Sequence, residues 1–97
     1  MKTNFKKAVK KYLPTLEQYV PIVARVHGES HPEFHDVHRV FNSINAKIMN
    51  SEEDLELNDE FYELRQITND YEIPDDVCET FAAVYNMISE LDRAYSL

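Results

Sequence analysis

The sequence predicts an all-α protein: an up-and-down four-helix bundle forming one domain over residues 1–97. Three observations support this fold class. The chain has one glycine in 97 residues, whereas sheet-rich proteins need glycines in their turns. Hydrophobic residues make up 43% of the composition, which is enough for a core. These residues recur three and four positions apart along four segments, the spacing of one helix face.

The first helix is expected to end at Gly28, with glycine adopting a positive φ as a C-cap. Pro14 and Pro21 fall inside this helix and each removes a backbone donor, so we expect a first helix kinked by prolines. Its apolar face comprises Phe5, Val9, Tyr12, Leu16, Tyr19, Val20, Val23 and Val26.

The second helix is predicted from a capping box, in which Ser30 is the N-cap residue and Glu33 is at N3. It should run to about Asn50, with the polar stretch from Asn50 to Asp54 as the break that follows. Its apolar stripe comprises Phe34, Val37, Phe41, Ile44 and Ile48.

The third helix is expected from about Asp54 to Asp70, and the fourth from Pro74 at its first position. Asp75 and Asp76 would then favour the dipole at the start of the fourth helix. The inward residues of the third helix are Leu57, Phe61, Leu64, Ile67 and Tyr71. Those of the fourth are Val77, Phe81, Val84, Ile88, Leu91 and Tyr95.

Charge and composition exclude several classes of protein. Residues 1–49 carry eight Lys and Arg against four Asp and Glu, and residues 50–97 carry two against fourteen. The net charge of −8 argues against a nucleic-acid binder. No apolar run approaches about 20 residues, so we expect neither a membrane span nor a signal peptide. A single cysteine excludes an internal disulfide framework and favours a reducing, cytoplasmic location.

All four histidines lie between His27 and His38, where a metal site is the obvious hypothesis. His27 projects inward from the first helix, and Glu52 would face inward if the second helix continued past Asn50. The alternative, purely structural interpretation is that His27 is a packed histidine at the end of a helix, bonded to a backbone carbonyl or to water. The outer three are spaced to chelate Zn²⁺ or Ni²⁺ in pairs, but a specific site needs more ligands. The three outer histidines are His31, His35 and His38.

Nothing in the sequence predicts an enzyme. One glycine excludes a phosphate-binding glycine loop. Cys78 shows no readable pairing with a histidine and is interpreted as a small packing residue. The carboxylates fall on outer helix faces, where solvation explains them.

Two stretches give the chain a family resemblance. Tyr19–Phe41, YVPIVARVHGESHPEFHDVHRVF, and Leu64–Leu91, LRQITNDYEIPDDVCETFAAVYNMISEL, resemble the iron–sulfur cluster repair di-iron proteins, which are hemerythrin-like four-helix bundles. The two matches come in the family's order and cover about half the chain. The resemblance implies a cytoplasmic bundle whose relatives hold two irons and restore damaged iron–sulfur clusters.

The family's iron ligands carry over only in part. His27 falls on a ligand position, and Glu52 retains the carboxylate of a His–x3–Glu pair whose histidine position is Ile48. The first-helix histidine pair falls on Phe5 and Lys6, and the last pair would fall beyond the final residue. The resemblance therefore implies residual metal ligands, His27 and Glu52, fewer than a bridged di-iron site takes.

Three functions stay open at this point. The first is a short, ligand-depleted hemerythrin-like relative without enzyme activity, an accessory or regulatory partner of a repair or cluster-containing protein. For this first function we expect no cofactor, although iron is possible. The second is an iron-binding repair protein whose site is completed by a homodimer. The third is a generic helical interaction module that docks partners through Tyr62, Tyr85 or Tyr95 and the acidic half of the chain.

Overall fold

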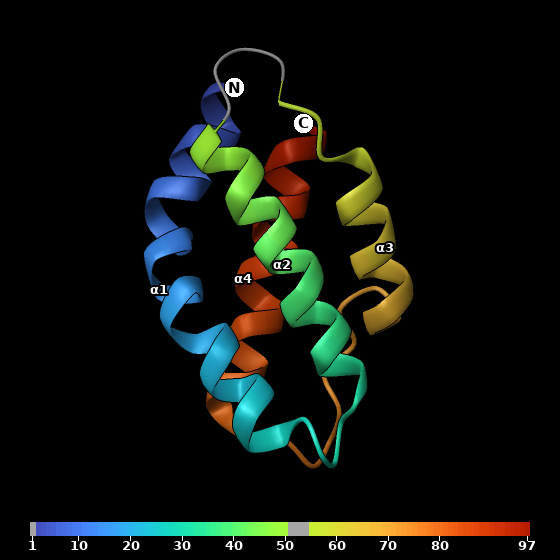
Figure 1. Ribbon diagram of the computed structural model, residues 1–97. Helices are drawn as coiled ribbons and strands as arrows, with labels where there is room; N and C mark the ends of the chain where they lie inside the picture. The colour runs from blue at the N-terminus through green and yellow to red at the C-terminus, as the bar shows by residue number, and fades with distance from the viewer. Residues whose placement is uncertain (1, 51–54) are drawn as a thin grey trace.

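The computed structural model describes residues 2–50 and 55–97. This part of the chain contains four helices and no strand, which confirms the predicted all-α bundle. Successive helices run in opposite directions, so both termini lie at the same end, at the top of Figure 1. The helices are α1 (Thr3–His27), α2 (Glu33–Asn50), α3 (Asn58–Thr68) and α4 (Glu79–Ser96).

The helices pack around one core. α1 packs against α4 and α2, and α2 also packs against α3. The Lys2 ammonium donates to the Leu97 carbonyl oxygen at 3.1 Å, which places the two ends of the chain together. The largest fully buried side chains include Phe5, Leu16, Phe34, Phe61, Phe81 and Tyr85.

The helical spacing predicted most of this core. All five predicted residues of the second helix are buried. On α1 the prediction was wrong for Val26, which is 62% exposed, because it lies about 240° around the helix from buried Val20. Ile67 in α3 and Tyr95 in α4 are half-buried at the edge of the core.

The two prolines do not divide the first helix. Pro14 and Pro21 are both inside α1, which is continuous from Thr3 to His27. Both prolines are exposed, so their rings lie on the solvent side of the helix. Any bend that they introduce leaves α1 a single element.

Two predicted helix starts were wrong, and one predicted end was right in position but not in backbone conformation. Gly28 is the C-cap of α1 as predicted, but its φ is −60° rather than positive. α2 begins at Glu33 without a capping bond from Ser30 among the described residues, and the amides of Phe34 and His35 donate to the carbonyl oxygens of His31 and Pro32. α4 begins at Glu79 with Cys78 as its N-cap, and Pro74 therefore lies in the connection before it. The predicted start of the third helix, Asp54, lies outside the described residues.

The left-handed turn occurs instead at the end of α3. Asn69, Asp70 and Tyr71 have φ values of 53°, 59° and 64°, a backbone region that non-glycine residues enter rarely. The amide of Tyr71 donates to the Thr68 hydroxyl oxygen at 2.8 Å, which supports the turn. This turn moves the chain from α3 towards α4.

A buried carboxylate connects α3 to α4. Asp92 is 6% exposed and accepts bonds from Arg65 Nε at 2.8 Å and Nη2 at 3.2 Å. The Tyr71 hydroxyl donates to the same carboxylate at 2.8 Å. Sequence reasoning missed this group, since Asp92 was assigned with the other carboxylates to an outer face.

Candidate functional site

A histidine and the only cysteine meet at the end of the bundle opposite the termini. His27 is the last residue of α1 and Cys78 is the N-cap of α4. The two helices are antiparallel and packed together, so the end of one lies beside the start of the other. His27 Nε2 lies 3.2 Å from Cys78 Sγ. The sequence showed no such pairing because the two residues are 51 positions apart.

This pair is a thiol–imidazole hydrogen bond at a partly open position. Cys78 is exposed and His27 is half-buried. Either the thiol donates to Nε2 or the Nε2–H group donates to sulfur. A nucleophile and base at this distance are one requirement of covalent catalysis, which also needs a third group to orient the base. Among the described residues, no side chain bonds His27 Nδ1.

The Phe81 ring fills the bundle interior beside this pair. Its centroid lies 5.6 Å from that of His27 and 5.4 Å from that of His31, both edge-on. It also packs on Phe34 at 5.1 Å and Tyr85 at 4.9 Å. The inward side of His27 therefore faces an aromatic ring rather than another ligand.

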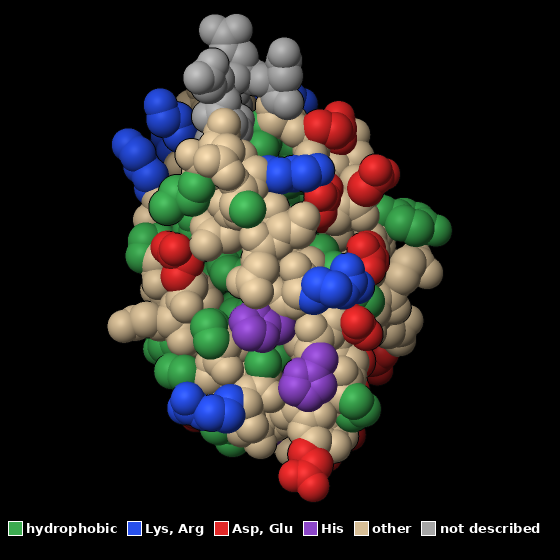
Figure 2. All heavy atoms as spheres, viewed as in Figure 1, with side chains coloured by type: hydrophobic (Ala, Val, Ile, Leu, Met, Phe, Trp, Pro, Cys, Tyr) green, Lys and Arg blue, Asp and Glu red, His purple; other side chains and the backbone are tan. Residues whose placement is uncertain are grey.

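The outer histidines are not gathered around a common point. His31 Nδ1 lies 3.0 Å from Glu33 Oε2, and its Nε2 lies 3.1 Å from Asp76 Oδ1. The first bond joins the turn after α1 to the start of α2, and the second joins it to the connection before α4. His35 instead lies over Gly28, and Figure 2 shows histidine side chains on the face formed by α2. His31 is therefore bonded to two carboxylates, whereas His35 and His38 remain neighbours three positions apart on α2.

Gly28 is required by space rather than by backbone conformation. A Cβ atom at this position would lie 2.3 Å from the Ala24 carbonyl oxygen and 2.4 Å from His35 Nε2. The His35 ring is exposed and can move, whereas the carbonyl belongs to the last turn of α1. The contact with the Ala24 carbonyl oxygen is therefore the reason that this position requires glycine.

Gly28→Ala should destabilise the protein by about 2 kcal/mol, because the backbone at the end of α1 must shift to admit the methyl group. Urea unfolding followed by circular dichroism measures this loss. Adding His35→Ala should recover only a small part of it. Full recovery in the double variant would show that the imidazole, and not the carbonyl, excludes the side chain.

Tyr85 should make the protein sensitive to alkali. Burial, and secondly the nearby carboxylate of Glu33, raises the pKa of Tyr85 to about 12. Below about pH 10 the Tyr85 hydroxyl keeps its proton in both the folded and the unfolded chain. As the pH rises further the unfolded chain loses it first, so the free energy of unfolding should fall by about 1.4 kcal/mol per pH unit.

Urea unfolding of the wild type and Tyr85→Phe between about pH 9 and about pH 12 tests this expectation. The wild type should lose stability faster than the variant above about pH 10. Burial, and secondly the bond to Asp92, also raises the pKa of Tyr71, which adds a slope common to both proteins. Parallel curves for the two proteins would contradict the effect assigned to Tyr85.

The two predicted metal ligands are not seen together. Glu52 lies outside the described residues. Asn50, the last residue of α2, is at the opposite end of the bundle from His27 (Figure 1). Within the described ranges, no three His, Cys, Asp or Glu side chains are grouped so as to hold a metal ion. Phe81 lies on the inward side of His27, and the pairing of His27 with Glu52 stays a prediction.

Comparisons with known proteins identify no relatives. No family model matches the chain, and no curated protein or solved structure matches it either. The resemblance to the cluster repair proteins therefore stays a prediction that rests on the two sequence stretches. Across the residues described, none of the helices has both the length and the apolarity to cross a bilayer.

Proposed function

We propose that this chain is a non-enzymatic, cytoplasmic binding protein on a hemerythrin-like scaffold. Its role is that of an accessory or regulatory partner of proteins that repair or carry iron–sulfur clusters under oxidative or nitrosative stress. The observation that carries the proposal is the aromatic packing around His27. Phe34 and Phe81 are 0% exposed and Tyr85 2%, which supports a bundle held together by apolar packing.

The surface supports a binding role. Five lysines in the first half of α1 and before it are exposed, and carboxylates gather along α3, at the right of Figure 2. Separated patches of opposite charge steer and orient a charged partner. Tyr62 in α3 is 61% exposed and offers an aromatic contact. The Tyr85 ring offers no surface to a partner because the residue is 2% exposed. The five exposed lysines, which form the basic patch, are Lys2, Lys6, Lys7, Lys10 and Lys11.

Affinity capture tests this proposal. The chain is used as bait in its own cells, with and without a nitric oxide donor, and captured proteins are quantified by mass spectrometry. Cluster-assembly or repair proteins should be enriched, and Lys7→Glu/Lys11→Glu should reduce their recovery because it reverses part of the exposed basic patch. Lys47→Ala on α2 is the control outside that patch. Capture that lacks every cluster-assembly and repair protein would contradict the proposed role.

A second candidate is metal binding shared by two copies. The observation that favours it is that His27 and Cys78, two metal-binding side-chain types, lie 3.2 Å apart at a partly exposed end of the bundle. A two-fold axis there would give a set of two nitrogens and two sulfurs, which suits Zn²⁺. Sedimentation with and without zinc tests it: a metal-dependent dimer lost in Cys78→Ser would support it, and a monomer under both conditions would exclude it.

A further inference from the structure

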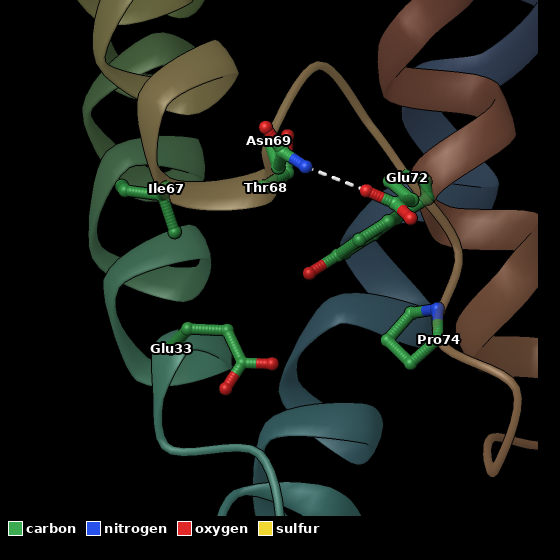
Figure 3. Close-up of a pocket in the computed structure, with 7 residues that line it drawn as sticks. Glu33, Ile67, Thr68, Asn69, Glu72 and Pro74 are labelled. Atoms are coloured by element: carbon green, nitrogen blue, oxygen red, sulfur yellow. Dashed lines mark hydrogen bonds between the residues drawn. The ribbon is translucent and has the colours of Figure 1, made fainter.

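A pocket of about 440 Å³ opens beside the end of α3 (Figure 3). Its walls come from the start of α2, the end of α3, the connection after α3, and α4. The left-handed turn at residues 69–71 directs the chain away from the α3 axis and leaves this space uncovered. The volume falls within the range of small-ligand sites, about 300–1,000 Å³.

The pocket carries two carboxylates and no basic side chain. Glu33 extends into it from α2, and Glu72 from the opposite wall (Figure 3). Glu33 bonds to His31 at 3.0 Å, and Glu72 accepts a bond from Asn69 Nδ2 at 2.5 Å. Within the described part of the chain, neither carboxylate forms an ion pair with Lys or Arg. The local charge therefore favours a cation.

A tyrosine hydroxyl in the pocket wall forms no hydrogen bond within the described part of the chain. Tyr85 is 2% exposed and lines the pocket, yet over the described ranges its hydroxyl forms no hydrogen bond. Among the described residues, the fully buried side-chain oxygens without a partner are on Asn45 and Glu60, so the Tyr85 hydroxyl is open to the pocket and a polar ligand atom can bond to it there. The Thr68 hydroxyl is already engaged, donating to the Leu64 carbonyl oxygen at 2.8 Å and accepting from the Tyr71 amide.

We propose that this pocket binds a primary ammonium group on a short aliphatic stem. The ammonium lies between Glu33 and Glu72 and donates to the Tyr85 hydroxyl oxygen, and the stem packs on Ile67 and Pro74. An anion would meet two carboxylates, and a metal ion would need more oxygen ligands than these walls supply. The ligand is either a free aliphatic amine or a lysine side chain of another protein. The proposal does not depend on the cluster-repair role.

Amide NMR spectra of the full chain, titrated with n-butylamine hydrochloride, test it. Saturable shifts are expected at the pocket residues, and n-butanol, the neutral analogue, should cause none. Glu72→Gln should weaken binding about tenfold, because it removes one of the two charges. Asp59→Asn, the same charge change at the far end of α3, should leave binding within about twofold. Tyr85→Phe keeps the ring and should weaken binding by removing only the hydroxyl.

Nα-acetyl-lysine methylamide distinguishes the two sources of the ammonium. Tighter binding than butylamine would assign the pocket to a lysine of a protein, and weaker binding would assign it to free amines. Either result upholds an ammonium site. Equal shifts with butylamine and butanol, or unchanged binding in Glu72→Gln, would overturn the proposal. Unchanged binding in Tyr85→Phe would overturn the part assigned to the hydroxyl.

Discussion

Phe81→Ala should destabilise the protein by about 4 kcal/mol, the largest loss expected from any single substitution considered. Phe81 is 0% exposed and packs on two histidines, Phe34 and Tyr85. Its removal leaves a cavity between α1, α2 and α4 that the surrounding helices can only partly fill. The His27 ring would also lose the surface that orients it towards Cys78.

Urea unfolding measures this loss, with a shift in midpoint at constant slope. Tyr62→Ala is the matched control, since Tyr62 is 61% exposed and its removal should change stability by less than about 0.5 kcal/mol. A loss below about 1 kcal/mol for Phe81→Ala would contradict the central place given to this ring.

Asp92→Ala should destabilise the protein by about 3 kcal/mol. The substitution leaves the Arg65 guanidinium and the Tyr71 hydroxyl without their shared acceptor. The expected value is at the low end for a buried ion pair, because the Arg65 side chain is 37% exposed and regains water.

Glu90→Ala provides the comparison, since Glu90 is an exposed carboxylate on α4 that pairs with Arg93 at 3.6 Å. Its loss should cost less than about 1 kcal/mol. A double-mutant cycle of Asp92→Ala with Tyr71→Phe should show coupling between the two side chains. Equal losses for Asp92→Ala and Glu90→Ala would show that the bridge between α3 and α4 is not a stabilising contact.

The sequence was sufficient to predict the helices but not their ends. The spacing of Phe34, Val37, Phe41, Ile44 and Ile48 placed one face of α2 in the core because burial follows helical periodicity. Helix ends depend instead on local contacts. Gly28 is the predicted cap, yet a close carbonyl rather than a positive φ requires the glycine. Pro74 is not the predicted start, because it lies in a connection held by the bond between His31 and Asp76.

Of the two residues in the candidate site, the sequence indicated only one. His27 stood out as a histidine next to glycine, whereas Cys78 gave no signal, since its partner lies in another helix. The same holds for Asp92 and for the pocket, which combine residues from distant segments. The predicted start at Pro74 placed Cys78 inside the fourth helix, and cysteine is not an N-cap residue type that would have marked it. Knowing that antiparallel α1 and α4 are neighbours would have paired it with His27.

The metal content of the purified, untagged protein tests the central claim most directly. Fe²⁺ is offered under anaerobic conditions, and retained iron, near-ultraviolet absorption of an oxo-bridged centre and thermal unfolding with and without chelator are measured. The proposed function predicts no retained iron pair and the same unfolding temperature with chelator. An iron pair in each chain, lost in His27→Ala but kept in His35→Ala, would contradict it and make repair chemistry the leading explanation.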